Sequence, residues 1–313
     1  MAAGIWNYRG RMKTLALFFL MPLIPFHEPG KWAQDPFQIS VNVDLVVLNA
    51  TVRDRAGRLA PDLSAKDFSV LEDGVEQTLR LFRREDLPVT VGLVIDHSGS
   101  MKQKLENVIA AALKFLEFSN PADQLFVVNF NEYVSFGLPL AMQFTGLPGP
   151  LKAAILQSPT TGRTALYDAV SVALKRLNLG GRDRNVLLVV SDGADNASKL
   201  GLEELLKMAG QSSAMIYVIG VFAPDDPDRN PGVLKRLAHS TGGEAFFPKE
   251  LEQLPAICER IAREIRSQYI LGYSSTNQGT PGNYRRIKVS AKSDSYDKLS
   301  VRTRAGYTNG VKP

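Results

Sequence analysis

The sequence predicts an α/β fold: a doubly wound, mostly parallel sheet accompanied by an accessory β-sandwich. Four nearly continuous apolar runs lie in the middle of the chain, at residues 91–95, 125–128, 186–190 and 216–221. Strands that are buried on both faces of a parallel sheet have this composition. Amphipathic helical stretches separate the runs, and alternating strands and helices join through right-handed crossovers. Shorter strand-like segments flank this region on both sides, and they predict the sandwich.

The first segment of the chain is basic and then apolar. Arg9, Arg11 and Lys13 precede an apolar run at residues 14–26, which is the pattern of a secretory signal peptide. The run is short and contains proline, whereas a membrane span needs about 20 apolar residues. We therefore expect a signal peptide over residues 1–33 and an exported protein, periplasmic or secreted. No clear cleavage site follows, so an uncleaved membrane anchor is the alternative.

Composition indicates a folded protein. The chain has 313 residues, of which 44% are hydrophobic and 22% are charged, enough for one large domain and a smaller one. The formal net charge is +5, from 37 basic and 32 acidic residues. Without the three basic residues of the leader it falls to 34 − 32 = +2. No basic stripe with interleaved aromatic residues is present, so nucleic acid is not an expected partner.

Residues 38–87 form the predicted N-terminal β segment, part of an Ig-like sandwich. Val41, Val43, Leu45 and Val47 alternate with polar neighbours, as they do in a half-buried strand. The dipeptide at residues 73–74 is Asp-Gly and separates two strand-like runs, which predicts a β-hairpin.

Residues 88–268 form the predicted α/β domain. Apolar stripes at helical spacing predict helices over residues 103–118 and 165–177. The one cysteine, Cys258, lies in a further helical pattern and cannot form an internal disulfide. We expect it to be a small buried hydrophobic residue rather than a reactive thiol.

Residues 269–308 form the predicted C-terminal β segment. The runs 269–273, 284–291 and 299–304 are rich in β-forming residues and are separated by Gly, Pro, Ser and Asn. Neither β segment alone offers many strands. We expect the two to complete one sandwich, with the α/β domain inserted between them; two separate small β units are the alternative.

The residues that carry chemistry follow the first apolar run. Asp96, Ser98 and Ser100 place one carboxylate and two hydroxyls on alternate residues. Ligand sites in open α/β sheets lie at the carboxyl ends of the strands, where the strand order reverses. Three hard oxygen donors suit Mg²⁺ or a similar cation. They do not suit zinc, which prefers His and Cys.

This motif resembles the metal-ion-dependent adhesion site (MIDAS) of von Willebrand factor type A (vWA) domains, whose first loop reads D-x-S-x-S. The resemblance covers about residues 88–268. The family takes a threonine from a second loop, for which Thr164 in the stretch beginning Thr-Gly-Arg-Thr is the match. It takes an aspartate from a third loop, for which Asp192 in Val-Val-Ser-Asp-Gly is the match. Three loops in the family's order are a far stronger signal than one.

The resemblance implies a Mg²⁺ site, with Mn²⁺ or Ca²⁺ as alternatives. In the family the hydroxyls bind the ion directly, the aspartates act partly through water, and an open position accepts a carboxylate from a partner protein. The flanks, which include Phe-Ser-Val-Leu-Glu-Asp-Gly and Ser-Gln-Tyr-Ile-Leu-Gly-Tyr, look like those of exported bacterial vWA-related proteins. We therefore expect a metal-dependent protein-binding or adhesion module of the cell envelope or secreted space, whose partner presents an acidic side chain. A membrane contact is expected only if the leader stays uncleaved.

Each motif residue also has a simpler interpretation. Asp96 or Ser100 could cap the helix over residues 103–118, and Thr164 could cap the next one. Asp192 with Gly193 could be an ordinary turn. His97, at the variable position, is expected to point to solvent or to pack locally, or else to line the ligand surface. Asp195 and Asn196 are expected to form a polar turn, with a second ion or a partner contact as the alternative.

Other function classes fit the sequence less well. An enzyme is not expected, because the chain has no G-x-S-x-G elbow, Walker A motif or Rossmann fingerprint. A metal-dependent hydrolase is the remaining enzymatic alternative. An envelope-complex scaffold that does not need the metal is another, and the intact motif argues against it. The leader argues against a cytoplasmic vWA protein that works with an AAA-type ATPase.

Overall fold

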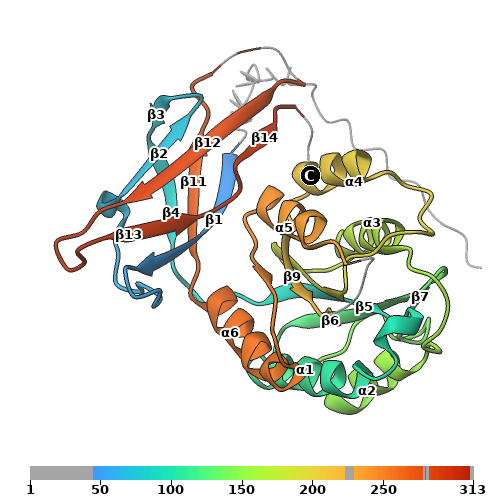
Figure 1. The fold of residues 1–313 in the computed structure, drawn as a ribbon. Coiled ribbons are helices and arrows are strands. Elements are labelled where there is room, and N and C mark those ends of the chain that lie inside the picture. The colour runs from blue at the N-terminus through green and yellow to red at the C-terminus, as the bar shows by residue number, and fades with distance from the viewer. Residues whose placement is uncertain (1–44, 223–228, 278, 280–281, 311–313) are drawn as a thin grey trace, which may run out of the picture. The chain divides into compact units, whose positions relative to one another are not determined.

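The computed structural model describes residues 45–222, 229–277, 279 and 282–310. The predicted signal peptide at 1–33 and the strand residues Val41 and Val43 lie outside this range. Among the described residues, no helix has both the length and the apolar character that crossing a membrane requires. The described residues form two layered parts, an α/β domain and a β-sandwich (Figure 1).

The α/β domain is built on a six-stranded sheet in the order β10-β9-β8-β5-β6-β7. Its four long strands coincide with the four apolar runs. Neighbours among β10, β9, β8, β5 and β6 pair in parallel, and β7 pairs with β6 in an antiparallel manner. The strands are β5 (Val89–Asp96), β6 (Gln124–Phe130), β7 (Val134–Phe136), β8 (Arg184–Ser191), β9 (Met215–Gly220) and β10 (Ala245–Phe246).

In the described part of the chain, six α-helices cover the two faces of this sheet. The group that contains α1 and α6 lies on one side, and the group that contains α3, α4 and α5 lies on the other (Figure 1). The predictions over 103–118 and 165–177 are confirmed as α1 and α3, whereas α2, α4 and α5 were not predicted. The helices are α1 (Leu105–Glu117), α2 (Pro148–Leu156), α3 (Leu166–Leu177), α4 (Leu202–Gln211), α5 (Pro231–Ser240) and α6 (Leu254–Arg266).

The two flanking segments build one β-sandwich. One sheet has the order β13-β1-β11-β4 and the other β14-β12-β2-β3, so each contains strands from both ends of the chain. Their facing side chains, such as Leu48, Val70, Leu271 and Ile287, form one buried cluster. The strands are β1 (Leu45–Asp54), β2 (Phe68–Glu72), β3 (Val75–Gln77), β4 (Leu79–Arg83), β11 (Tyr269–Ser274), β12 (Tyr284–Ala291), β13 (Leu299–Arg302) and β14 (Gly306–Thr308).

This arrangement confirms the predicted fold class and excludes two separate β units. The predicted limits at residues 88 and 268 stay predictions. The Asp-Gly hairpin is also present, because Glu72 pairs with Val75 across two residues that both have positive φ, 49° at Asp73 and 86° at Gly74. Such turns match the right-handed twist of the strands they connect.

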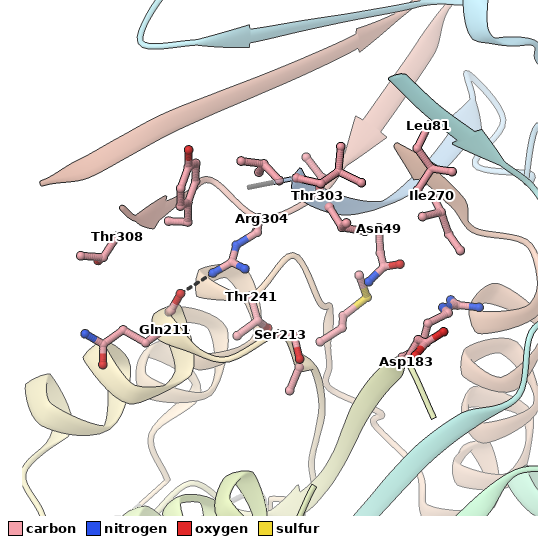
Figure 2. A pocket seen from close by; sticks show the side chains of 18 of the residues that line it. Asn49, Leu81, Asp183, Gln211, Ser213, Thr241, Ile270, Thr303, Arg304 and Thr308 are labelled. Atoms are coloured by element: carbon pink, nitrogen blue, oxygen red, sulfur yellow. Dashed lines mark hydrogen bonds between the residues drawn. The ribbon is translucent and has the colours of Figure 1, made fainter. Parts of the chain in front are cut away.

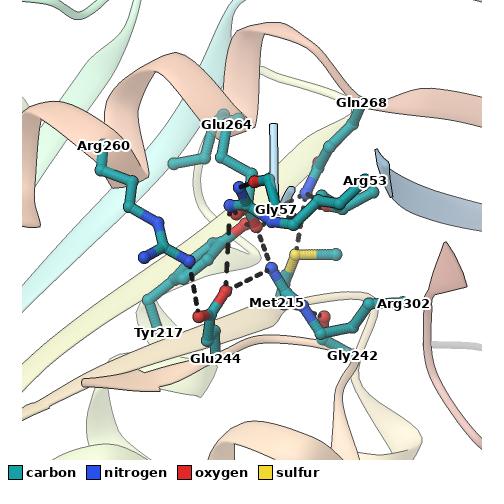
Figure 3. Close-up of polar contacts among 12 residues, drawn as sticks. Arg53, Gly57, Met215, Tyr217, Gly242, Glu244, Arg260, Glu264, Gln268 and Arg302 are labelled. Carbon is teal, nitrogen blue, oxygen red and sulfur yellow. Dashed lines mark hydrogen bonds and ion pairs between the residues drawn. The ribbon is translucent and has the colours of Figure 1, made fainter. Parts of the chain in front are cut away.

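A buried ionic network joins the α/β domain to the sandwich (Figure 3). Glu264 of α6 is fully buried and receives hydrogen bonds from Arg53 of β1 and Arg302 of β13. The hydroxyl of Tyr217 in β9 donates to the same carboxylate at 2.6 Å. A single side chain therefore links strands of both parts of the protein.

Candidate metal centre

The fold places the first motif loop at the edge of the sheet where the strand order reverses. Asp96 is the last residue of β5, and β5 has β6 on one side and β8 on the other. The chain continues into a short 3₁₀ turn at Gly99–Met101 (η2), whose Met101 side chain is fully buried and anchors it. Asp96 therefore lies at the carboxyl edge of the sheet, where open α/β sheets bind ligands.

Hydrogen bonds hold the side chains of the first loop together. The Ser98 backbone N–H donates to Asp96 Oδ1 at 2.8 Å, which is the two-residue turn that aspartate favours. The Ser98 and Ser100 hydroxyl oxygens lie 3.1 Å apart. Asp96 and Ser98 are buried, whereas Ser100 is exposed. The loop thus presents its oxygens from a buried base to an accessible rim.

The third loop meets the first through Asp192. The residue directly follows β8, and its carboxylate accepts a hydrogen bond from the Ser100 hydroxyl, with Oγ and Oδ2 2.5 Å apart. Its other oxygen accepts from the Ala194 N–H at 3.2 Å. Asp192 and Gly193 therefore form the turn that was the simpler interpretation of the sequence. The other carboxylate oxygen of Asp192 points at the first loop.

The second loop holds Thr164 against the third loop through backbone hydrogen bonds. Thr164 is buried, its N–H donates to the Asn196 side chain at 2.9 Å, and its carbonyl accepts from the N–H groups of Asn196 and Ala197 at 3.0 Å. The second loop also touches the first, because the Thr161 N–H donates to the His97 carbonyl at 2.8 Å. All three predicted loops are therefore in contact.

Helix capping does not account for these residues. The helix α1 begins at Leu105 with Lys104 at its N-cap position, so neither Asp96 nor Ser100 caps it. The helix α3 begins at Leu166 with Ala165 at its N-cap position, so Thr164 does not cap it. The structure overturns the capping interpretation of all three.

Asp96 lies in an electrostatically unfavourable position. Burial, followed by repulsion from Asp192, raises the pKa of Asp96 from 3.8 to about 6, although hydrogen bonds from Ser98 and Ser191 act in the opposite direction. Neutral groups donate to both carboxylates: Asp96 accepts from the Ser98 N–H and the Ser191 hydroxyl, and Asp192 accepts from the Ser100 hydroxyl and the Ala194 N–H. Two carboxylates that repel each other are a site that a bound cation would stabilise.

The donor set suits a hard cation. Among the described residues, no group of three or more His, Cys, Asp and Glu side chains is arranged to hold a metal ion. The candidate donors are instead two carboxylates and neutral hydroxyls, which are oxygen ligands of the kind that Mg²⁺ accepts.

His97 was expected either to point to solvent or to pack locally. Its side chain is fully buried, so it packs locally and does not point to solvent. Its N–H donates to the Phe130 carbonyl at 2.6 Å, which ties the loop to the end of β6. Burial lowers the pKa of His97, so it is held as a neutral packing residue rather than as part of the accessible surface.

The sequence did not predict the supporting role of Ser191, but it did predict the minor role of Asp195 and Asn196. Ser191, the last residue of β8, donates from its hydroxyl to Asp96 Oδ2 at 2.7 Å. A hydroxyl at the end of a buried strand could have indicated it. Asp195 accepts bonds from the Tyr167 N–H at 2.8 Å and the Ser198 hydroxyl at 2.6 Å. Asp195 and Asn196 therefore form the expected polar turn and brace the second and third loops.

Comparisons with known proteins show the family to which the chain belongs. The family model of the von Willebrand factor type A domain matches residues 90–260. A search of curated proteins finds no match.

Solved structures also resemble the chain. A von Willebrand factor type A protein from Catenulispora acidiphila is 13% identical with a TM-score of 0.51, over 86% of this chain and 76% of that chain. BatB of Bacteroides thetaiotaomicron is 17% identical with a TM-score of 0.47, over 57% and 100%. The corresponding domain of the pilus tip protein Mfa5 from Porphyromonas gingivalis is 15% identical with a TM-score of 0.47, over 57% and 95%. At 13% identity, the likeness to the Catenulispora acidiphila protein concerns the fold alone.

Proposed function

Since the chain belongs to the von Willebrand factor type A family, we propose that it binds a partner protein through a divalent cation held at the carboxyl edge of its central sheet. The residues that would hold the cation are Asp96, Ser98, Ser100, Thr164 and Asp192. Mg²⁺ is the proposed ion, with Mn²⁺ or Ca²⁺ as substitutes. Domains of this family are known as protein–protein adhesion modules, which favours binding over catalysis.

The observation that carries the proposal is the buried pair of aspartates. Asp96 and Asp192 are at most 2% exposed, and Ser100 bridges the first loop to Asp192. A cation would relieve the repulsion between the two carboxylates. With the hydroxyls bound directly and the aspartates acting partly through water, as in the family, much of the ion's positive charge would remain available to attract a further carboxylate.

The accessible rim carries two basic side chains beside the half-buried Glu132, whose carboxylate accepts a hydrogen bond from the Arg163 N–H at 2.7 Å. Lys102 follows Ser100 by two residues and Arg163 precedes Thr164 by one, and both are exposed. Positive charge beside a metal site increases the rate of encounter with an acidic surface. We therefore propose a partner that presents a Glu or Asp side chain to the ion.

Export is also part of the proposal. It is supported by the basic and apolar pattern of residues 9–26. Under this proposal the domain works in the periplasm or outside the cell, where millimolar-range divalent cations can fill a moderate-affinity site.

Metal binding is tested first, with Mn²⁺ as a paramagnetic probe read by electron spin resonance. The wild-type protein should bind Mn²⁺, and Mg²⁺ should compete. Asp96→Ala and Ser100→Ala should each weaken binding at least tenfold, whereas the matched control Asp297→Ala, whose side chain is 79% exposed, should bind normally. Equal Mn²⁺ affinity in Asp96→Ala and wild type would refute the site.

Partner binding is tested by affinity capture from envelope extract, with and without chelator. Proteins retained by the wild type should be lost with chelator and with Asp96→Ala, and should be retained by Asp297→Ala. Circular dichroism of each variant shows that it is folded. Capture that persists in chelator and in folded Asp96→Ala would favour a metal-independent scaffold.

A further inference from the structure

One strand of the sandwich is paired on both sides over only part of its length. Residues 45–50 of β1 pair with β11, whereas β13, on the other side of β1, pairs only with residues 51–54. Beyond Arg302 the chain leaves β1, and Gly306 pairs with β12 in the other sheet. Among the described residues, the first half of β1 therefore has an open edge.

Hydrogen bonds of the second half of β1 identify the residues that face this edge. The Asp54 N–H donates to the Arg58 carbonyl, and the Val52 carbonyl accepts from the Ala60 N–H. These bonds point away from β13. Backbone groups alternate in direction along a strand, so the odd-numbered residues Leu45, Val47 and Asn49 direct their N–H and C=O groups to the open edge.

The edge borders a large cavity (Figure 2). The cavity has a volume of about 600 Å³, within the range of small-ligand and peptide sites. Its lining includes Leu45, Val47 and Asn49 on one side and Gln211 at the end of α4 on another. Leu45 and Val47 are 40% and 47% exposed, although they belong to a strand with a buried partner face.

We propose that this edge binds an extended peptide segment of another protein, which adds a strand to the sheet beside β1. An unpaired strand edge offers donors and acceptors at the spacing of a peptide backbone. The apolar side chains of Leu45, Leu81 and Ile270 line the same cavity and provide contacts for alternate side chains of the peptide. The six residues of the edge, 45–50, span about 20 Å, at about 3.3 Å per residue.

Charge in the cavity selects the kind of peptide. Three arginines line it, Arg83, Arg184 and Arg304, against one aspartate, Asp183. The peptide is therefore apolar at alternate positions and carries an acidic residue. This site is separate from the proposed metal centre, since none of the five proposed ligands lines the cavity.

The probe is a fluorescent hexapeptide, Val-Thr-Val-Glu-Val-Thr, titrated into the full-length protein and followed by fluorescence anisotropy. Two matched controls have the same side chains but carry N-methyl groups on alternate amides, one control for each of the two alternating sets. N-methylation removes backbone donors, so it should weaken binding at least tenfold. Equal binding of the methylated and unmethylated peptides would overturn strand addition and indicate a merely apolar pocket. The proposal would also be overturned if neither the unmodified peptide nor its Val-to-Leu and Val-to-Ile analogues bound.

Two protein variants test the edge itself. Val47→Pro removes the N–H that faces the open edge, and Val47→Lys places a charge there. Both should reduce peptide affinity at least tenfold, whereas Val75→Lys, at a residue that is 58% exposed elsewhere in the sandwich, should not. Normal binding by folded Val47→Lys would contradict the proposal.

Hydrogen exchange gives an independent measurement. In the free protein, the amides of residues 45, 47 and 49 should exchange rapidly, and those of 46, 48 and 50 slowly. The peptide should slow the first group alone. Slow exchange at 45, 47 and 49 in the free protein would show that the edge is already paired and would overturn the inference.

Discussion

Asp96 is the residue at which burial and charge conflict most directly, and this conflict predicts how the metal-free protein behaves. Its pKa is raised from 3.8 to about 6 by burial and by Asp192. The folded state then binds more protons than the unfolded state between these pH values. Stability contributed by this group is therefore lost as pH rises through that window.

We accordingly predict that Asp96→Asn stabilises the metal-free protein. In chelator at neutral pH, the free energy of unfolding in urea should increase by on the order of 1–3 kcal/mol. With Mg²⁺ present, the wild type should gain stability and the variant should not. The control Asp297→Asn should change neither value. A loss of stability for Asp96→Asn in chelator would mean that the carboxylate is already compensated.

Cys258 gives a second prediction at the scale of one residue. It is 1% exposed, and burial raises the pKa of its thiol to about 12. Only thiolate reacts with aromatic disulfides, so the native protein at mildly alkaline pH should react at least about 100-fold more slowly than the protein in denaturant. Absorbance of the released thiolate measures both rates. Fast reaction in the native state would show that α6 opens readily.

Among single residues, the sequence predicted those that belong to a recognisable motif. Asp96, Ser98, Ser100 and Asp192 were predicted and lie in contact, and Thr164 reaches the third loop through its backbone. Ser191 and the burial of His97 were not predicted. Both depend on what a neighbouring strand places beside the residue, and no spacing along the chain encodes that.

Among the elements, the β2–β3 hairpin depends on the conformation of its turn. Gly74 has φ 86°, a region that costs an L-residue about 1 kcal/mol, although a Cβ there would meet nothing within 4 Å. Gly74→Ala should therefore lower the free energy of unfolding by about 1 kcal/mol through backbone strain alone. Urea unfolding measures it.

The matched control is Gly210→Ala. Gly210 also has open space around its Cβ position, but it lies in α4 with ordinary φ. Alanine favours the helix there, so stability should stay level or increase slightly. Equal destabilisation by both substitutions would show that φ at Gly74 is not the cause.

The elements differ in how far sequence alone could predict them. The strands β5 and β9 are buried along their whole length, and β6 and β8 along all but one residue, so their apolar runs stand out. The helix α4 buries only Leu205 and Ala209, and α2 begins with Pro-Gly-Pro. A helix that covers a sheet with few side chains leaves little periodicity in the sequence.

For the whole molecule, the sandwich was predictable only as a combination of two distant segments. The runs that became β1 and β11 are more than 200 residues apart, yet they pair directly from Leu45 to Ala50. The requirement that every sheet face be covered favoured joining them. The ionic network that fixes the sandwich to the α/β domain was not predicted, because Arg53, Glu264 and Arg302 share no local pattern.

Glu264 is therefore the residue on which the union of the two parts depends most. Its charge is opposed by burial but favoured more strongly by Arg302, Tyr217 and Arg53, so its pKa is lowered. Stability from this carboxylate is present above its ordinary pKa of 4.5 and is lost as pH falls through the lowered value. Glu264→Gln should lower the free energy of unfolding by about 3 kcal/mol at neutral pH, because it removes the buried charge that the half-buried Arg53 and Arg302 share and leaves them only the more exposed Glu244. The loss should shrink in acid.

The control is Glu259→Gln, on the same helix in an exposed pair with Arg263, which should lower the free energy of unfolding by less than about 0.5 kcal/mol. Equal effects of the two substitutions in urea unfolding would show that the network does not hold the parts together.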